Sequence, residues 1–480
     1  MKKDRRQKDY SGNKQILQLT YFYSVLFLVL IFYVSFFVYK DSDTVINNSY
    51  NKREGLYAEK VVRGSILASN GETLAYTDTS KGKEVRVYPY GPAFAHVVGY
   101  NVKGKSGLES ACTFKLLTSN VSFSEKISNE TGGIKNPGNN IVTTLDVDAQ
   151  MAAYSALGNN KGAVVLMDAK TGDILAMVSK PDFDPNNIEM IWDDINSSNG
   201  NSMLLNRATQ GLYPPGSTFK IVTALEYIKE NRNINKYEFN CNGSFSYNGT
   251  TINCYHGTKH GESDFVRSFA KSCNSSFANI TTSLDKSKFK KTCEELMFNS
   301  PVPCPLNASV SYVPVTKSSA IDELIQTGIG QGKSEITPYH MCLISSAIAN
   351  DGILMTPKLV KYVETVYGDE VSSSDDQEYK RLISSEDSDK LKMLMREVIT
   401  QGTGTNLLNT YGYTAYGKTG SAEFSSNKKE SHAWFTGFAV TDKGRTVAIS
   451  VIVENGGSGG QTAVPVAKAV FDAYLYKYIK

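Results

Sequence analysis

The 480-residue chain has almost no excess charge, since 51 lysine and arginine residues stand against 48 aspartate and glutamate residues, for a formal net charge of +3. This balance provides no basic surface for nucleic acid, so we expect no nucleic-acid partner. The chain also lacks an internal repeat and a low-complexity tail. Its length leaves room for two or three domains, one of them large enough to bury its own core.

Charged residues are absent from one segment near the amino terminus, ILQLTYFYSVLFLVLIFYVSFFV at 16–38. As a helix, its 23 residues would cover about 34 Å, enough for the hydrocarbon layer of roughly 30 Å. A signal peptide has a shorter apolar region that ends in small residues, whereas this one continues through Phe36, Phe37 and Val38. We therefore predict an uncleaved transmembrane helix at 16–38.

Six lysine and arginine residues lie between residues 2 and 14. Positive residues stay on the cytoplasmic side, so residues 1–15 are expected to form a cytoplasmic tail. Everything after the helix would then be extracellular, and the protein would be a single-pass protein of the cell membrane.

The remaining chain divides into two predicted domains. Residues 40–140 are polar with short apolar bursts, which predicts a small strand-rich spacer, and NETGGIKNPGNN at 129–140 predicts a linker. In residues 141–480, a hairpin is indicated at 163–179, an alternating strand at 446–453 and a terminal helix at about 462–478. This arrangement predicts an α+β domain whose sheet joins its first and last segments.

The segment YPPGSTFK, residues 213–220, precedes a helical pattern. Its prolines and glycine would place Ser217 at a helix amino terminus, where a free backbone N–H can stabilise an oxyanion. Lys220 lies one turn further and is partly desolvated, so it could accept the serine proton. Alone, this S-x-x-K motif is more typical of a capped core helix with a snorkelling lysine, and the same spacing recurs elsewhere, as at Ser80 and Lys83.

Two downstream motifs change that interpretation. Ser272 and Asn274 form S-x-N, and Lys418, Thr419 and Gly420 form K-T-G. This ordered set occurs in penicillin-binding proteins and class A β-lactamases. A second K-T-G at Lys170 precedes the serine and falls in the predicted hairpin turn.

The chain resembles the class B, monofunctional penicillin-binding proteins, which are transpeptidases of peptidoglycan synthesis. The resemblance includes RGSILASNGETLA at 63–75 and GKSGLES at 104–110 in the spacer, and IGQGKSEITPYHM at 329–341 and REVITQGTGTNL at 396–407 in the main domain. It covers about 400 residues and implies a penicillin-binding transpeptidase fold on a pedestal domain at 40–140.

The resemblance also implies roles for the motif residues. Ser217 would attack the donor carbonyl, Lys220 would take its proton, and Ser272 would relay protons to and from the amines. Asn274 would bond the donor side chain and Lys418 would supply a positive field. Thr419 and Ser421, on either side of Gly420, would bind the donor carboxylate, and the backbone N–H groups of Ser217 and Ser421 would hold the oxyanion. The implied ligands are D-Ala-D-Ala stem peptides, an amine acceptor and β-lactam antibiotics.

Two other functions use the same motifs. A class A β-lactamase needs a positioned glutamate, but no E-x-x-L-N lies between the second and third motifs. A β-lactam sensor needs an intracellular output domain, and only residues 1–15 are predicted to lie inside. The spacer is also too short for a glycan polymerase, so resemblance implies a multi-pass membrane polymerase as partner.

Seven cysteines, an odd number, fall in the predicted extracellular part. Cys241, Cys254, His260 and Cys273 form C-x12-C-x5-H-x12-C. Asn248 and Gly249 predict a hairpin turn, so Cys241 and Cys254 could form a disulfide, free thiols are a second alternative, and a structural Cys3His zinc site is a third. Similarity to class B enzymes of clostridial type, of the Firmicutes, favours zinc, with His260 rather than His256 as the ligand.

Overall fold

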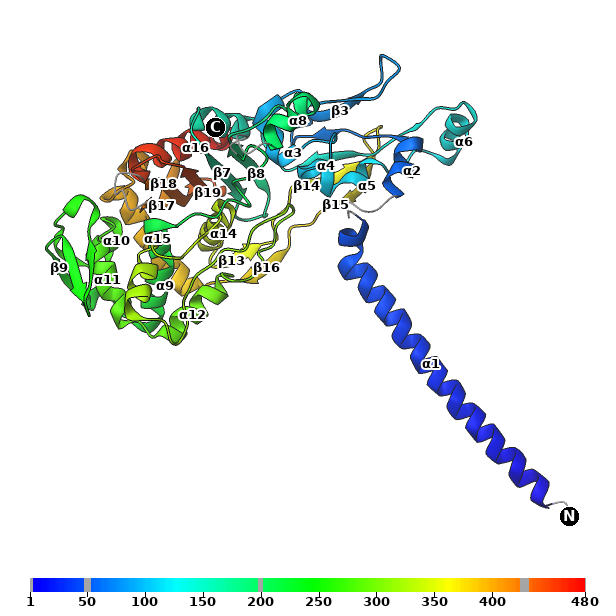
Figure 1. The fold of residues 1–480 in the computed structure, drawn as a ribbon, viewed down its shortest axis with the longest axis horizontal. Helices are drawn as coiled ribbons and strands as arrows, with labels where there is room; N and C mark the ends of the chain where they lie inside the picture. Colours follow the sequence, from blue (N-terminus) through cyan, green and yellow to red (C-terminus); the bar gives the residue numbers. More distant parts are fainter. Residues whose placement is uncertain (1–2, 47–52, 197–201, 424–430, 480) are drawn as a thin grey trace.

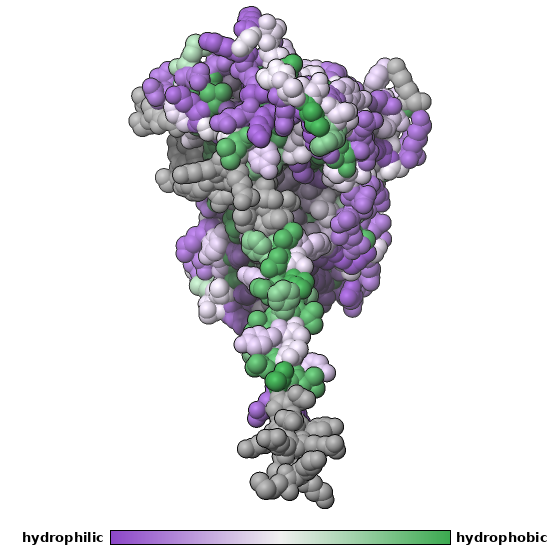
Figure 2. Space-filling model, turned by 90° about the vertical axis from the view of Figure 1, so that its right-hand side faces the viewer, coloured by the Kyte–Doolittle hydropathy of each residue, from purple (hydrophilic) through white to green (hydrophobic). Residues whose placement is uncertain are grey.

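The computed structural model describes residues 3–46, 53–196, 202–423 and 431–479. Helix α1 (Lys3–Ile46) extends away from the rest of the protein as a long rod (Figure 1). Its segment Lys14–Lys40 has a mean hydropathy of 2.3 and buries none of its surface against the protein. Figure 2 shows this apolar surface as a green column. The helix is long and apolar enough for a single-pass membrane anchor.

The pedestal contains more helix than strand, so the prediction of a strand-rich domain is wrong. The short apolar segment at 95–98 forms helix α3 rather than a strand. The predicted linker at 129–140 is also wrong, because helix α6 ends in it and strand β5 crosses it. The pedestal elements are α2 (Arg53–Lys60), β1 (Val61–Val62), β2 (Ile66–Leu67), β3 (Thr73–Asp78), β4 (Val85–Val87), η1 (Gly91–Phe94), α3 (Ala95–Val98), α4 (Gly107–Ala111), α5 (Thr113–Leu116), α6 (Phe123–Thr131), β5 (Asn136–Pro137) and β6 (Asn140–Thr143).

One six-stranded sheet crosses the predicted domain boundary. Its order is β15-β14-β6-β2-β3-β4, with β14 at Val360–Glu364 and β15 at Glu370–Ser373. Two strands from the second half of the chain therefore complete the pedestal sheet, and residue 140 lies in a strand. Strand β14 pairs with β6, with Val360 opposite Thr143, and local sequence patterns do not reveal a partner so far away along the chain.

The rest of the protein beyond the pedestal, which we call the body, is built on a five-stranded antiparallel sheet of order β17-β18-β19-β7-β8. This order confirms that the first and last segments of the domain share a sheet. Helices α7 and α16 pack together on one face, and α14 covers the other face at β7, β18 and β19. Every residue of β7, β8 and β19 is buried, as expected for a central sheet covered on both faces. The edge strand β17 carries the third motif.

The bounds of the body elements are as follows: α7 (Val147–Leu157), β7 (Gly162–Asp168), β8 (Ile174–Lys180), η2 (Pro185–Asn187), α8 (Ile188–Asn196), η3 (Gly216–Phe219), α9 (Lys220–Glu230), η4 (Ile234–Lys236), β9 (Glu238–Cys241), β10 (Ser244–Tyr247), β11 (Thr250–Asn253), η5 (Tyr255–Gly257), β12 (Gly261–Asp264), α10 (Phe265–Ala270), α11 (Asn274–Ser283), α12 (Lys286–Glu295), α13 (Ile321–Gly328), α14 (Pro338–Ala349), β13 (Ile353–Met355), β16 (Glu378–Arg381), α15 (Ser385–Thr400), η6 (Thr405–Leu407), β17 (Tyr413–Glu423), β18 (Ser431–Thr441), β19 (Thr446–Val453), η7 (Gly459–Ala463) and α16 (Val464–Ile479).

Residues 238–264 form a projection that we call the arm. In it β9 pairs with β12 and β10 pairs with β11, and the arm lies at the end of the body opposite the pedestal (Figure 1). Asn248 and Gly249 form its two-residue turn with positive φ angles of 46° and 83°. The predicted hairpin is confirmed, because this turn type requires positive φ at both central positions.

Candidate active site

Ser217 lies in the 3-10 turn η3, directly ahead of helix α9. Gly216 has a φ of 52°, and a Cβ atom on it would lie 2.9 Å from the Cβ atom of Ala422 in β17. Only glycine allows this backbone shape and this close approach. The glycine therefore brings the serine next to the strand of the third motif, and Ser217 remains half-buried at the wall of a cavity.

The turn that carries Ser217 is also held from the side of the sheet. The indole Nε1 of Trp434 donates a hydrogen bond to the carbonyl of Pro214 at 3.0 Å. A Cβ atom at Gly420 would come within 3.2 Å of the carbonyl of Pro215. Gly420 of the K-T-G motif thus leaves room for the turn that carries Ser217, and the hydrogen bond from Trp434 holds that turn in place.

Lys220 is fully buried, and its amine faces the second motif. Its Nζ donates to the Ser272 carbonyl at 2.7 Å, to the Ser272 Oγ at 3.2 Å and to the Asn274 Oδ1 at 2.7 Å. Burial lowers the pKa of Lys220 to about 8. Part of the lysine population is therefore neutral near neutral pH and can accept a proton.

Lys418 is also fully buried and approaches the same serine. Its Nζ donates to the Ser272 Oγ at 2.9 Å and to the Thr419 carbonyl at 3.0 Å. Burial, and then the charge of Lys220, hold the pKa of Lys418 well below its ordinary value. Two amines that share one acceptor in a buried place resist being charged together, so deprotonation of one stabilises the charge on the other.

Ser272 is one of the few non-glycine residues with positive φ, at 57°. This backbone conformation is uncommon for serine and persists only where its surroundings impose it. Asn274 begins helix α11, and its Nδ2 donates to the carbonyl of Asn253 in the arm at 3.2 Å. Its second N–H hydrogen remains for another acceptor. The second motif is therefore anchored partly by the arm.

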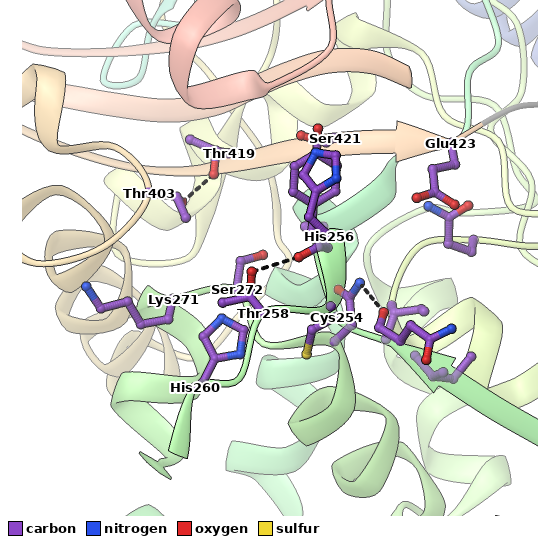
Figure 3. Close-up of a pocket in the computed structure, with 18 of the residues that line it drawn as sticks. Cys254, His256, Thr258, His260, Lys271, Ser272, Thr403, Thr419, Ser421 and Glu423 are labelled. Carbon is purple, nitrogen blue, oxygen red and sulfur yellow. Dashed lines mark hydrogen bonds between the residues drawn. The ribbon is translucent and has the colours of Figure 1, made fainter. Parts of the chain in front are cut away.

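The third motif contributes hydroxyl groups to the opposite wall. The hydroxyls of Thr419 and Thr403 are hydrogen-bonded to each other (Figure 3). The backbone N–H of Gly459 donates to the Ser421 Oγ at 3.4 Å. Thr403 lies in the segment QGTGT that follows α15. The family motif at 396–407 includes this threonine, but sequence analysis did not identify it as a site residue.

These walls enclose a cavity of about 840 Å³. Ser217, Ser272, Asn274, Thr419 and Ser421 line it, while Lys220, Lys418 and Gly420 lie behind its surface. All of the predicted catalytic and substrate-binding residues thus come together. The sequence did not reveal that the arm forms one wall, with Thr251 to Thr258 facing the cavity (Figure 3).

The four predicted metal ligands also come together, beside the cavity. Their sulfur and nitrogen atoms all lie within 4.8 Å of one another. The Sγ atoms of Cys241 and Cys254 are 3.6 Å apart, those of Cys254 and Cys273 are 3.7 Å apart, and the Cys241 Sγ lies 3.5 Å from the His260 Nδ1. A disulfide requires about 2.05 Å, so no bond joins Cys241 and Cys254 in this structure.

The three distances of 3.6, 3.7 and 3.5 Å match those between ligands of a tetrahedral ion. Zinc bonds of about 2.3 Å to sulfur and 2.0–2.1 Å to nitrogen place neighbouring ligand atoms about 3.6–3.8 Å apart. The hydrogen bond between Cys273 and Cys254 lowers the pKa of the Cys254 thiol and raises the pKa of the Cys273 thiol, so it favours the thiolate that a metal needs at Cys254. The donor set and its geometry therefore suit structural zinc. His256 points instead toward the cavity and is exposed (Figure 3).

Comparisons with known proteins agree with this site. Residues 162–472 match the penicillin-binding protein transpeptidase domain. The chain belongs to the penicillin-binding protein transpeptidase family. Residues 63–141 match the penicillin-binding protein A dimerisation domain, which corresponds to the predicted pedestal.

Individual relatives match along most of their length. The peptidoglycan D,D-transpeptidase PbpA of Mycolicibacterium smegmatis is 31% identical over 446 residues, which cover 86% of this chain and 89% of the relative. The ceftriaxone acyl-enzyme structure of penicillin-binding protein A from M. tuberculosis has a TM-score of 0.79 and 28% identity, covering 88% of this chain and all of that one. A structure of a D,D-transpeptidase domain from Eggerthella lenta has a TM-score of 0.78 and 27% identity. The match covers 87% of this chain and 99% of that one.

Proposed function

We propose that the chain is a serine-type peptidoglycan D,D-transpeptidase that cross-links stem peptides and is acylated by β-lactams. One observation carries the proposal: the half-buried Ser217 lines a cavity together with Ser272, which accepts hydrogen bonds from both Lys220 and Lys418. A nucleophile, a base and a proton relay are the parts that acyl transfer through a serine requires. The PbpA and acyl-enzyme relatives support the same chemistry.

In the first half of the reaction, the Ser217 Oγ attacks the carbonyl of the penultimate D-alanine of the donor. Its proton passes to neutral Lys220. The peptide bond to the terminal D-alanine breaks, and the leaving amine takes up that proton through the Ser272 hydroxyl. The backbone N–H groups of Ser217 and Ser421 hold the negative oxygen. Strand β17 is an edge strand, so one side of its backbone pairs with no other strand of the sheet.

In the second half, the neutral amine of the acceptor attacks the acyl carbonyl and forms the new peptide bond. Its proton passes through Ser272 to Lys220, and Lys220 returns a proton to the Ser217 Oγ as the ester bond breaks. Thr419 and Ser421 hold the donor carboxylate before it leaves, and the remaining N–H of Asn274 bonds the donor side chain. The test is release of one D-alanine per cross-link from a D-Ala-D-Ala stem peptide, lost in Ser217→Ala.

The apolar surface of α1 supports a membrane anchor, and the six basic residues ahead of it favour a cytoplasmic amino terminus. The catalytic body would then be extracellular, where a multi-pass membrane polymerase delivers new glycan. A soluble chain starting at Tyr57 should still bind penicillin but should not rescue a depletion strain. Full rescue by that soluble chain would contradict the polymerase partnership.

The cysteine cluster is proposed to hold one structural zinc ion through Cys241, Cys254, His260 and Cys273. When bound, zinc would supply no catalysis and would only connect these four ligands. Cys273 lies between Ser272 and Asn274, so fixing it would hold Ser272 in its strained backbone conformation. The zinc ion would thereby connect the arm to the second motif and support it.

A further inference from the structure

The segment that carries Thr403 is held by close backbone packing on two sides. A Cβ atom on Gly402 would lie 2.3 Å from the carbonyl oxygen of Ala270, the last residue of α10. A Cβ atom on Gly460 of η7 would lie 2.5 Å from the carbonyl oxygen of Thr403. Only glycine permits these approaches. Thr403 is therefore fixed between the helix that leads to the second motif and the turn behind the third motif.

The side chain of Thr403 makes one hydrogen bond in the part of the chain that the structure describes, and its partner is the hydroxyl of Thr419 (Figure 3). The hydroxyl of Thr419 likewise bonds only Thr403 among the described residues. Both residues line the cavity, but Thr403 is exposed and Thr419 is only 5% exposed. A hydroxyl carries one hydrogen and accepts two hydrogen bonds. The bond between the two threonines uses one hydrogen, so one hydrogen of the pair remains.

The proposed reaction decides which hydrogen remains. The donor carboxylate accepts hydrogen bonds and donates none, so Thr419 must give its only hydrogen to the carboxylate. The hydrogen between the two threonines must then come from Thr403. Ser421 is arranged in the same way, because its Oγ accepts a hydrogen bond from the backbone N–H of Gly459 at 3.4 Å. Each hydroxyl of the carboxylate site thus accepts from a donor in the wall and can donate into the cavity.

We infer that Thr403 donates a hydrogen bond to Thr419 and thereby directs the Thr419 hydrogen at the donor carboxylate. The inference rests on the proposed transpeptidase function and adds a positioning residue to its donor site. Thr403 touches neither the carboxylate nor the reacting carbonyl. Hydrogen bonds in a chain polarise one another, so the bond from Thr403 strengthens the one that Thr419 makes to the substrate. Without Thr403, the hydroxyl of Thr419 loses both its orientation and this strengthening.

The test uses the full chain in detergent and two thioester donors that differ only in the carboxylate. One is N-benzoyl-D-alanyl-thioglycolate, and the other is its S-ethyl analogue, in which a methyl group replaces the carboxylate. Release of the thiol gives kcat/KM for acylation. In Thr403→Val, kcat/KM for the thioglycolate donor should fall about fivefold, the effect of weakening one hydrogen bond. The value for the S-ethyl donor should stay within about twofold of the wild type.

Two variants control for a change in the shape of the wall. Thr403→Ser keeps the hydroxyl and should stay within about twofold of the wild type on both donors. Thr405→Val changes an exposed threonine of the same segment that does not line the cavity, and it should behave like the wild type. In a Thr419→Val background, Thr403→Val should have no further effect, because the hydrogen bond that it supports is already absent.

The outcomes separate the inference from the function on which it rests. An unchanged kcat/KM in Thr403→Val, equal losses on the two donors, or a loss that also occurs in Thr403→Ser would overturn the inference. Additive losses in the double variant would overturn it too, because Thr403 would then act independently of Thr419. Thiol release from the thioglycolate donor that persists in Ser217→Ala would instead contradict the proposed transpeptidase function.

Discussion

The amines of Lys220 and Lys418 meet at one acceptor, the Oγ atom of Ser272, at 3.2 Å and 2.9 Å. Residues from three distant parts of the chain are thus connected before any substrate binds. Because a hydroxyl oxygen accepts two hydrogen bonds and donates one, Ser272 can pass its own proton outward while both lysines remain bonded to it. The arrangement is a proton relay that connects Ser272 to the base Lys220 and to the positive field of Lys418.

The first prediction concerns the pH dependence of acylation. Burial lowers the pKa of Lys220 to about 8, and only the neutral amine above that value accepts the serine proton. The rate of acylation by penicillin should therefore rise from pH 6 and level off above about pH 8. Stopped-flow measurement of the acylation rate checks this. Lys220→Ala should be slower by at least about 10²-fold, and a profile that falls across this range would contradict Lys220 as the base.

The second prediction concerns the cysteine cluster. Elemental analysis of purified protein should find about one zinc ion per chain, and Cys241→Ser should lose it. Chelation or that substitution should lower the melting temperature and slow acylation together, because Ser272 loses its support. Cys304→Ser, away from the cluster, is the control and should retain zinc. A metal-free protein whose Cys241 and Cys254 have no titratable thiols would establish a disulfide instead.

The third prediction concerns the support of the nucleophile turn. Trp434→Phe removes the hydrogen bond from the indole Nε1 to the carbonyl of Pro214 and keeps an aromatic ring. The half-buried carbonyl then loses its donor, which should lower the free energy of unfolding by about 1 kcal/mol. Acylation should slow in the folded protein. Trp192→Phe, on α8, should leave the acylation rate unchanged, and equal rates in both variants would show that the hydrogen bond does not position Ser217.

The fourth prediction concerns the pedestal. Glu109 is fully buried between Arg63 and Arg86, with both N–O distances at 2.6 Å. Although burial favours the protonated acid, the two guanidinium groups hold the pKa of Glu109 below its usual value. Its stabilising contribution is therefore present at neutral pH and is lost as the pH falls through that lowered pKa. Glu109→Gln leaves two buried cations uncompensated and should lower the free energy of unfolding by about 3–5 kcal/mol.

Chemical denaturation of Glu109→Gln, with the exposed Glu130→Gln as control, checks this prediction. The acylation rate of the folded protein should stay the same, because the arginine and glutamate cluster lies in the pedestal. A stability equal to that of the control would show that the cluster does not hold the pedestal together.

The sequence predicted the motif residues because their chemistry depends on short spacings. Ser217 and Lys220 are one turn apart, and the central sheet follows from periodic strands such as 446–453. The pedestal sheet was not predictable, because β14 and β6 come from distant parts of the chain and are joined only by backbone pairing. The wall formed by the arm depends on how a hairpin docks. The segment 129–140 resembled a loop because Gly and Asn residues surround its two-residue strand, Asn136–Pro137.

The central claim is that Ser217 is the nucleophile of a slow-releasing acyl-enzyme, and intact-mass spectrometry after penicillin treatment tests it most directly. The wild-type protein should gain the mass of one penicillin, the adduct should persist in buffer without an amine acceptor, and Ser217→Ala should gain nothing. An adduct that survives in Ser217→Ala would place the nucleophile elsewhere, and one that disappears from the wild type within seconds would identify a β-lactamase.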